Sequence, residues 1–113
     1  MRGEQPSIAV ILPAYNEELT IRQTMQAFHQ ALPEAQIVVV NNKSKDATFD
    51  IAVQTLAALA CEGQVINENR QGKGNAMRRA FIDIDADIYV LADADMTYPA
   101  ERARDLIQLK NLQ

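Results

Sequence analysis

Apolar residues along the chain form short continuous runs that alternate with amphipathic stretches. The runs are rich in residues that favour β-structure and lie at residues 8–12, 37–40, 64–67 and 88–92. Apolar runs of this length are typical of strands buried on both faces of a parallel sheet. The pattern therefore predicts a sheet with helices packed on both sides.

Between and after these runs, apolar residues recur at spacings of three and four, which places them on one face of a helix. The predicted inward-facing residues are, helix by helix, Ile21, Met25, Phe28 and Leu32; Phe49, Val53, Leu56 and Ala60; Met77, Ala80, Phe81 and Ile84; and Leu106 with Ile107.

Local signals predict where these elements begin and end. Pro13 should end the first strand, because proline cannot donate a hydrogen bond to a central ladder. Asn16 suits the N-cap of the first helix, with Glu17 and Glu18 in its first turn. The other expected boundaries are Ser44 or Asp46 as the second N-cap, Gly63 at the end of that helix, Gly74 at the start of the third helix and Pro99 at the start of the fourth.

Strict alternation of strand and helix predicts one α/β domain over residues 1–113, a Rossmann-like three-layer α/β/α fold with right-handed crossovers. We expect the strand order 3-2-1-4, which places the topological switch between the first and fourth strands. The loops at residues 13–18 and 93–98 then meet at the crevice where open α/β sheets bind ligands.

Composition narrows the classes of partner. The formal net charge of −4 argues against general nucleic-acid binding, which needs a basic surface. The single cysteine, Cys61, has no partner for an internal disulfide, and no apolar stretch approaches the length of a membrane span. We therefore expect a cytoplasmic protein, at most peripheral to a membrane.

Asp93 and Asp95 follow the fourth apolar run, at the predicted crevice. Two carboxylates so close together favour a cation between them, and oxygen ligands suit Mg²⁺ or Mn²⁺. A metal held in this way usually binds phosphate oxygens. The alternative is an acidic turn that caps the next helix.

Three other loops carry candidate chemistry. Tyr15 and Glu17 could stack on a base and bind a ribose hydroxyl, or could belong to a helix start with an exposed tyrosine. The amides of Asn41 and Asn42 could bind the edge of a base, although asparagine is also an ordinary turn residue. Two glycines around Lys73 suit an anion held by backbone N–H groups and a positive charge.

Together the four loops resemble family 2 glycosyltransferases. Residues 10–18 (VILPAYNEE) look like the opening strand and loop of that family, and residues 40–48 (VNNKSKDAT) resemble its V-D-D/N-x-S-x-D-x-T segment. Residues 70–76 (RQGKGNA) are similar to its G-K-G-x-A stretch, and Asp93-Ala94-Asp95 to its D-x-D motif. The branch most similar is that of polyprenyl-phosphate sugar transferases.

The resemblance implies a glycosyltransferase A-type domain that binds a UDP- or GDP-linked sugar for inverting transfer to a polyprenyl phosphate or a sugar. By position, Pro13, Tyr15 and Glu17 would contact the base and ribose, and Asn41, where the family usually has aspartate, would face the base edge. Lys73 would lie near the nucleotide. Asp93 would also contact the nucleotide, and Asp93 with Asp95 would bind Mg²⁺ or Mn²⁺.

Chains of this family continue well past the D-x-D motif, so we expect this one to be the donor half alone. It should transfer sugar poorly by itself and form a homo-oligomer, because its fourth strand is an apolar sheet edge. The alternatives are a truncated, non-catalytic nucleotide-binding or interaction module and, on the string Asp93-Ala94-Asp95-Met96-Thr97, a haloacid-dehalogenase-like phosphatase. A response-regulator receiver domain would need its acidic pair after the first strand.

Overall fold

The structure is a computed structural model, and it describes residues 6–94 and 100–102. Strands and helices alternate as the sequence predicted. In chain order they are β1 (Ile8–Ala14), α1 (Ile21–Ala31), β2 (Gln36–Asn41), α2 (Thr48–Leu59), β3 (Gly63–Asn67), α3 (Lys73–Asp83), β4 (Ile88–Leu91) and the 3₁₀ turn η1 (Ala100–Arg102). The inward residues predicted for a fourth helix, Leu106 and Ile107, lie outside the described residues.

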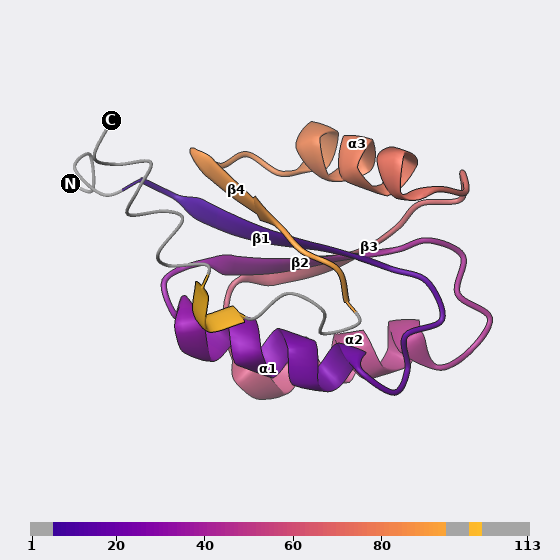
Figure 1. Cartoon of the computed structure of the whole chain (residues 1–113), viewed down its shortest axis with the longest axis horizontal. Coiled ribbons are helices and arrows are strands. Elements are labelled where there is room, and N and C mark those ends of the chain that lie inside the picture. Colours follow the sequence, from indigo (N-terminus) through magenta and orange to yellow (C-terminus); the bar gives the residue numbers. More distant parts are fainter. Residues whose placement is uncertain (1–5, 95–99, 103–113) are drawn as a thin grey trace.

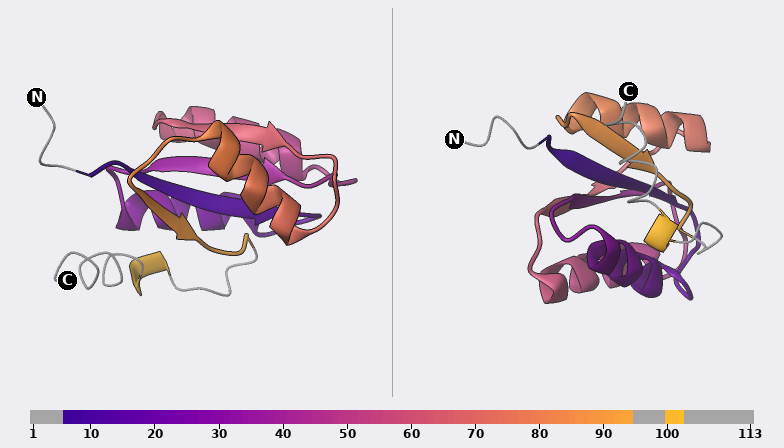
Figure 2. Two further views of the ribbon diagram at one scale, coloured as in Figure 1. Left: turned by 90° about the horizontal axis from the view of Figure 1, so that it is seen from above. Right: turned by 60° about the vertical axis from the view of Figure 1, so that its left-hand side comes forward.

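The four strands form one parallel sheet in the order β3-β2-β1-β4, which confirms the predicted topology. Helices α1 and α2 cover one face, and α3 covers the other (Figures 1 and 2). The strand order reverses between β1 and β4, so the loops that follow these two strands lie next to each other. No helix in the described part of the chain is long and apolar enough to cross a membrane.

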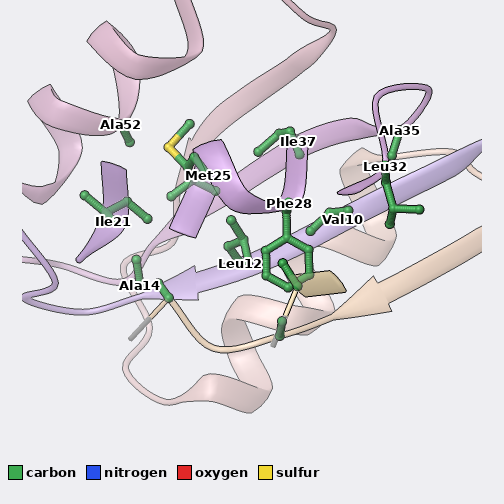
Figure 3. Close-up of a cluster of buried hydrophobic side chains, with 14 of the residues drawn as sticks. Val10, Leu12, Ala14, Ile21, Met25, Phe28, Leu32, Ala35, Ile37 and Ala52 are labelled. Atoms are coloured by element: carbon green, nitrogen blue, oxygen red, sulfur yellow. The ribbon is translucent and has the colours of Figure 1, made fainter. Parts of the chain in front are cut away.

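The larger core cluster lies between α1 and the sheet. All members of the predicted α1 stripe are at most 1% exposed, and they pack on β1 and β2 side chains such as Val10, Leu12 and Ile37 (Figure 3). Burial of a side chain of this size is worth about 1.5–3 kcal/mol, so this interface holds α1 firmly on the sheet. The stripe contains Ile21, Met25, Phe28 and Leu32.

The inward face predicted for α2 is displaced by about one residue, although the predicted Leu56 does pack against the core. Thr48, Ala52 and Thr55 are buried, whereas Val53 is 44% exposed. A shift of one position rotates a helix face by roughly 100°. The two threonines can be buried because their hydroxyls are hydrogen-bonded within the fold; that of Thr55 donates to the carbonyl of Ile51 at 2.7 Å.

Strand β1 continues through Pro13 to Ala14, contrary to the prediction that Pro13 ends it. The N–H of Asn42 donates to the Ala14 carbonyl at 2.8 Å, and the N–H of Ala92 donates to the Ile11 carbonyl at 3.2 Å. The backbone N–H and C=O groups of alternate β1 residues therefore point to β2 and to β4. The backbone N and C=O of Pro13 lie on the β4 side, as those of Ile11 do. Because β4 ends opposite Ile11, the missing N–H of Pro13 removes no ladder bond.

Other predicted boundaries also differ. Helix α1 begins at Ile21 rather than after Asn16. Gly63 opens β3 instead of ending α2, and a Cβ there would lie 2.0 Å from the Ile37 carbonyl oxygen, so only glycine fits. Helix α2 ends instead at Ala60, which has a left-handed backbone with φ 54°.

The elements beside the outer edge of the sheet are less buried than predicted. Strand β4 is half-buried rather than buried on both faces, because it lies at the sheet edge, and its Leu91 is 42% exposed. On α3, Ala80 and Ile84 are buried as predicted, whereas Phe81 is 47% exposed. The Phe81 ring packs edge-to-face on Tyr89 at a centroid distance of 4.9 Å.

Candidate functional site

A cavity of about 370 Å³ opens at the carboxyl ends of the strands, where the predicted crevice lies. This volume falls in the range of small-molecule sites. The lining residues come from the loops after all four strands: Pro13, Ala14, Tyr15, Glu17, Asn42, Gln71, Gly72, Lys73, Asp93 and Ala94. The tertiary structure therefore brings together Pro13, Tyr15, Glu17, Lys73 and Asp93, whereas Asn41 is not among the lining residues and Asp95 lies outside the described residues.

The loop after β1 presents an aromatic ring and a carboxylate to the cavity. Tyr15 lines the cavity and is 47% exposed, so its ring is accessible to a flat ligand such as a base. Glu17 is partly buried beside it, and the Thr20 hydroxyl lies 3.4 Å from one of its carboxylate oxygens. A carboxylate here can accept hydrogen bonds from sugar hydroxyls.

The loops after β1 and β2 are tied together by hydrogen bonds in both directions. The Asn16 N–H donates to Ser44 Oγ at 2.9 Å, and Asn16 Oδ1 accepts the Lys45 N–H at 2.8 Å. The Glu17 N–H donates to Thr48 Oγ1 at 2.8 Å. Asn16 adopts a left-handed backbone with φ 54°, which asparagine tolerates better than most residues. Its role is to link two loops, not to cap a helix.

A second pair of contacts strengthens this link. Asp46 accepts hydrogen bonds from the N–H groups of Glu18 at 3.3 Å and Thr48 at 3.0 Å, and Glu18 accepts the N–H of Ala47 at 3.1 Å. Desolvation alone would raise the pKa of the Asp46 carboxyl, but these bonds together with the Thr48 hydroxyl lower it. The N-cap of α2 is Ala47 rather than the predicted Ser44 or Asp46, although Asp46 accepts the N–H of Thr48, the first residue of the helix.

Asn42 anchors the loop after β3. Its Nδ2 group donates to the carbonyls of Glu68 at 3.0 Å and Arg70 at 2.7 Å, and its Oδ1 accepts the Gly72 N–H at 2.8 Å. The side chain is buried, and all of these contacts reach one loop. Gly72 has φ 111°, which favours glycine, and Lys73 follows as the first residue of α3. Asn42 thereby sets the position from which Lys73 reaches the cavity.

The amide of Asn41, predicted to face a base, is bound within the sheet edge. Its Nδ2 group donates to Asn67 Oδ1 at 2.9 Å, and its Oδ1 accepts the Ser44 N–H at 3.4 Å. Asn41 pairs with Asn67 in the register of β2 with β3, which explains this contact. The adjacent Asn42 lines the cavity instead, and only the register of the strands distinguishes the two asparagines.

Glu68 is a buried carboxylate beneath the same loop. It accepts the Arg70 N–H at 2.7 Å and the Arg70 Nε–H at 3.3 Å, and Arg79 Nε lies 4.0 Å away. The backbone hydrogen bond from Arg70 is the main reason that the pKa of Glu68 is lowered. No pattern in the sequence predicts a role for Glu68, because a lone glutamate before a loop carries no distinctive spacing.

Lys73 and Asp93 form an ion pair at the cavity, between the ammonium nitrogen and carboxylate Oδ1. Both side chains are about half exposed, so the pair itself contributes little to stability. Among residues 6–94 and 100–102, no three His, Cys, Asp or Glu side chains gather into a group that could hold a metal. Asp93 places a single carboxylate at the cavity. Mg²⁺ and Mn²⁺ can bind through one or two protein carboxylates together with phosphate oxygens of a ligand, so this carboxylate suits either ion.

Solved structures share this fold. A mannosyltransferase from Pyrobaculum calidifontis in complex with GDP-Man and Mn²⁺ superposes with a TM-score of 0.77 at 26% identity, covering 86% of this chain and 30% of that one. Glucosyl-3-phosphoglycerate synthase from Mycobacterium tuberculosis, in complex with Mn²⁺, UDP-glucose and phosphoglyceric acid, superposes with a TM-score of 0.65 at 26% identity, covering 80% and 34%. The fold is thus of the glycosyltransferase A type.

Sequence relatives agree with this assignment. Protein RfbJ of Shigella flexneri is 41% identical over 101 residues, which cover 89% of this chain and 74% of RfbJ. Dolichol-phosphate mannosyltransferase of Pyrococcus furiosus is 31% identical over 107 residues, covering 92% of this chain but 30% of that enzyme. The family described as "Glycosyl transferase family 2" matches residues 9–111. The chain therefore belongs to glycosyl transferase family 2.

Proposed function

We propose that this domain binds the nucleotide-diphosphate part of a UDP- or GDP-linked sugar in the cavity between the four loops. The observation that carries the proposal is the convergence of Tyr15, Glu17, Lys73 and Asp93 on one cavity at the topological switch of the sheet. An aromatic ring, a hydrogen-bond acceptor, an ammonium group and a carboxylate are the groups that a base, a ribose and a metal-bound diphosphate require.

Each side chain has a separate task in this proposal. Tyr15 would stack on the base, with Pro13 beside it, and Glu17 would accept hydrogen bonds from ribose hydroxyls. Lys73 would carry positive charge toward the phosphates, and Asp93, with Asp95, would hold Mg²⁺ or Mn²⁺. When bound, the divalent ion would stabilise the negative charge of the departing nucleoside diphosphate as a Lewis acid.

The complexes of the two structural neighbours with Mn²⁺ and a nucleotide sugar support this assignment. In the complete reaction, an acceptor oxygen would attack the anomeric carbon with inversion, and the acceptor would be a polyprenyl phosphate or a sugar. Asn41 stands where the family usually has aspartate, but the amide that lines the cavity is that of Asn42.

A second candidate is a module that binds nucleotide without transferring sugar. The chain spans 30% of the Pyrococcus mannosyltransferase and 24% of the glycosyltransferase YdaM of Bacillus subtilis, so sugar transfer is a separate proposal from nucleotide binding. Assays of transfer and of donor hydrolysis by the purified chain distinguish the two candidates. Sustained transfer would exclude the non-catalytic module.

Nucleotide binding itself is tested by thermal shift and calorimetry with UDP and GDP, in Mn²⁺ and in EDTA. A ligand that binds the folded state at a hundred times its Kd stabilises it by about 2.7 kcal/mol. We expect at least one of the two nucleotides to raise the melting temperature, and to raise it more in Mn²⁺ than in EDTA. If neither UDP nor GDP raises the melting temperature, in Mn²⁺ or in EDTA, the proposal is wrong.

A further inference from the structure

Two threonine hydroxyls of the first helix region converge on one backbone carbonyl beside Asp93. Thr20 Oγ1 lies 2.8 Å from the carbonyl oxygen of Ala94, and Thr24 Oγ1 lies 3.1 Å from the same atom. A carbonyl oxygen has two lone pairs, so both hydroxyls can donate to it. Ala94 itself is buried and lines the cavity.

These contacts hold the chain where the sheet no longer does. Strand β4 ends at Leu91, and the N–H of Ala92 still donates to the Ile11 carbonyl of β1. Beyond Ala92, the two hydroxyls bind this backbone at the Ala94 carbonyl, the last described residue of the segment. The Ala92 N–H bond and the bonds to the Ala94 carbonyl lie on either side of Asp93 in the chain, so together they determine where its carboxylate is presented.

Thr24 is buried, so its hydroxyl must find a hydrogen-bond partner inside the protein. Thr24 is 1% exposed and lies among the apolar residues of α1, where valine would fill the same volume. A buried hydroxyl is unfavourable unless it is hydrogen-bonded. Its single proton is shared between Ala94 and the Thr20 carbonyl, 3.0 Å away, within its own helix.

Thr20 joins the two sides of the cavity. Its hydroxyl is closest to Ala94, and it also lies 3.4 Å from the Glu17 carboxylate. One side chain thus contacts Glu17, which lines the cavity, and the segment after β4, which carries Asp93.

We propose that Thr20 and Thr24 are positioning residues for the segment after β4 that carries Asp93, the proposed metal ligand. Through the Ala94 carbonyl they hold the Asp93 backbone against α1, so that the carboxylate meets a divalent ion and the diphosphate in a fixed place. This inference rests on the proposed function for its ligand, but the anchoring of the backbone can be measured without one.

The binding test compares Thr20→Val and Thr24→Val with the parent chain, by calorimetry with UDP and GDP. Loss of one hydrogen bond should weaken binding in Mn²⁺ roughly three- to tenfold. Binding of the same nucleotide in EDTA should change by less than about twofold, because Tyr15 and Glu17 remain. Thr24→Ser retains the hydroxyl and should restore the affinity in Mn²⁺.

Thr55→Val is the matched control. Thr55 is 4% exposed and donates to the carbonyl four residues earlier in α2, as Thr24 does in α1, but it does not line the cavity. Loss of the Thr55 hydroxyl should leave nucleotide binding in Mn²⁺ unchanged. If Thr55→Val weakens binding as much as Thr24→Val does, the effect is one of general stability and the inference is wrong.

Amide hydrogen exchange of the unliganded chain provides the second readout. Peptides that cover residues 92–94 should exchange faster in Thr20→Val and Thr24→Val than in the parent, and unchanged exchange would overturn the inference. Unchanged affinity in Mn²⁺ would also overturn it. If exchange rises while the parent itself binds no nucleotide, the anchoring is supported and the proposed function fails.

Discussion

Lys73, the first residue of α3, forms an ion pair with Asp93, which follows β4, and the pair lies at the cavity. A cation at a helix N-terminus is disfavoured by the helix dipole, so an anionic partner at this point is favourable. The ammonium group contacts the carboxylate that we assign to the metal. A divalent ion and Lys73 would therefore compete for Asp93, and Lys73 would then be available to a phosphate.

Asp93→Asn should weaken nucleotide binding in Mn²⁺ by about tenfold or more, which corresponds to about 1.4 kcal/mol. Binding in EDTA should change much less. Stability should change by less than about 1 kcal/mol, because the ion pair with Lys73 is half exposed. Calorimetry and urea unfolding measure both quantities, with Asp85→Asn as an exposed control. Equal affinity of Asp93→Asn and parent in Mn²⁺ would identify the acidic segment as a helix-capping turn.

Tyr15→Ala should weaken nucleotide binding equally in Mn²⁺ and in EDTA, because stacking does not depend on the ion. Stacking of a base on an aromatic ring is worth about 1–3 kcal/mol. Tyr15→Phe retains the ring and should bind nearly as the parent does. Titrations of UDP and GDP into the three proteins test this, and a loss confined to Mn²⁺ would show that the ring does not contact the base.

Asn42→Ala should destabilise the fold by about 2–4 kcal/mol, because this buried side chain loses three hydrogen bonds at roughly 1 kcal/mol each. Asn75→Ala removes one exposed bond, from Nδ2 to the Gln71 carbonyl at 2.9 Å, and should cost less than about 1 kcal/mol. Urea unfolding measures both changes. Similar values for the two variants would mean that Asn42 does not anchor the loop after β3.

Acid should destabilise this protein partly through Glu68, whose pKa in the fold is lowered chiefly by the backbone hydrogen bond from Arg70. A lowered pKa means that the folded state binds fewer protons than the unfolded chain. The stabilisation is present above the unfolded pKa, about 4.3, and is lost as the pH falls through the lower folded value. Asp46 acts in the same direction.

Urea unfolding at pH 7, 5 and 3 measures this dependence. Glu68→Gln should be less stable than the parent at pH 7, and its stability should fall less between pH 5 and pH 3. Asp50→Asn, at an exposed carboxylate of α2, is the control and should follow the parent. A parallel pH dependence in Glu68→Gln and parent would show that Glu68 does not contribute.

Strand β4 should mediate self-association. It lies at the end of the sheet order, and its exposed Leu91 and the nearby Phe81 are apolar. Apolar edge strands pair readily with another chain. We expect a homodimer or larger assembly in sedimentation at micromolar concentration, and Leu91→Lys should shift it toward monomer. A parent that sediments only as a monomer would contradict this prediction.

The sequence by itself determined the alternation of strands and helices, the order of the sheet and the crevice at its switch point. These features depend on patterns within one element, or on rules of connection that hold for parallel sheets in general. The apolar stripe of α1 is an example, since spacings of three and four residues specify a buried face without reference to any partner. The family resemblance likewise depends on the order of four short segments.

Only the tertiary structure decided which neighbouring residue performs each task. Asn41 and Asn42 are chemically identical, and the pairing of β2 with β3 turns one to Asn67 and the other to the cavity. The rotation of α2 and the place of Pro13 depend in the same way on what each element packs against. Thr20 and Thr24 meet Ala94 across 74 and 70 positions of the chain, and no local pattern encodes contacts that form only when distant segments fold together.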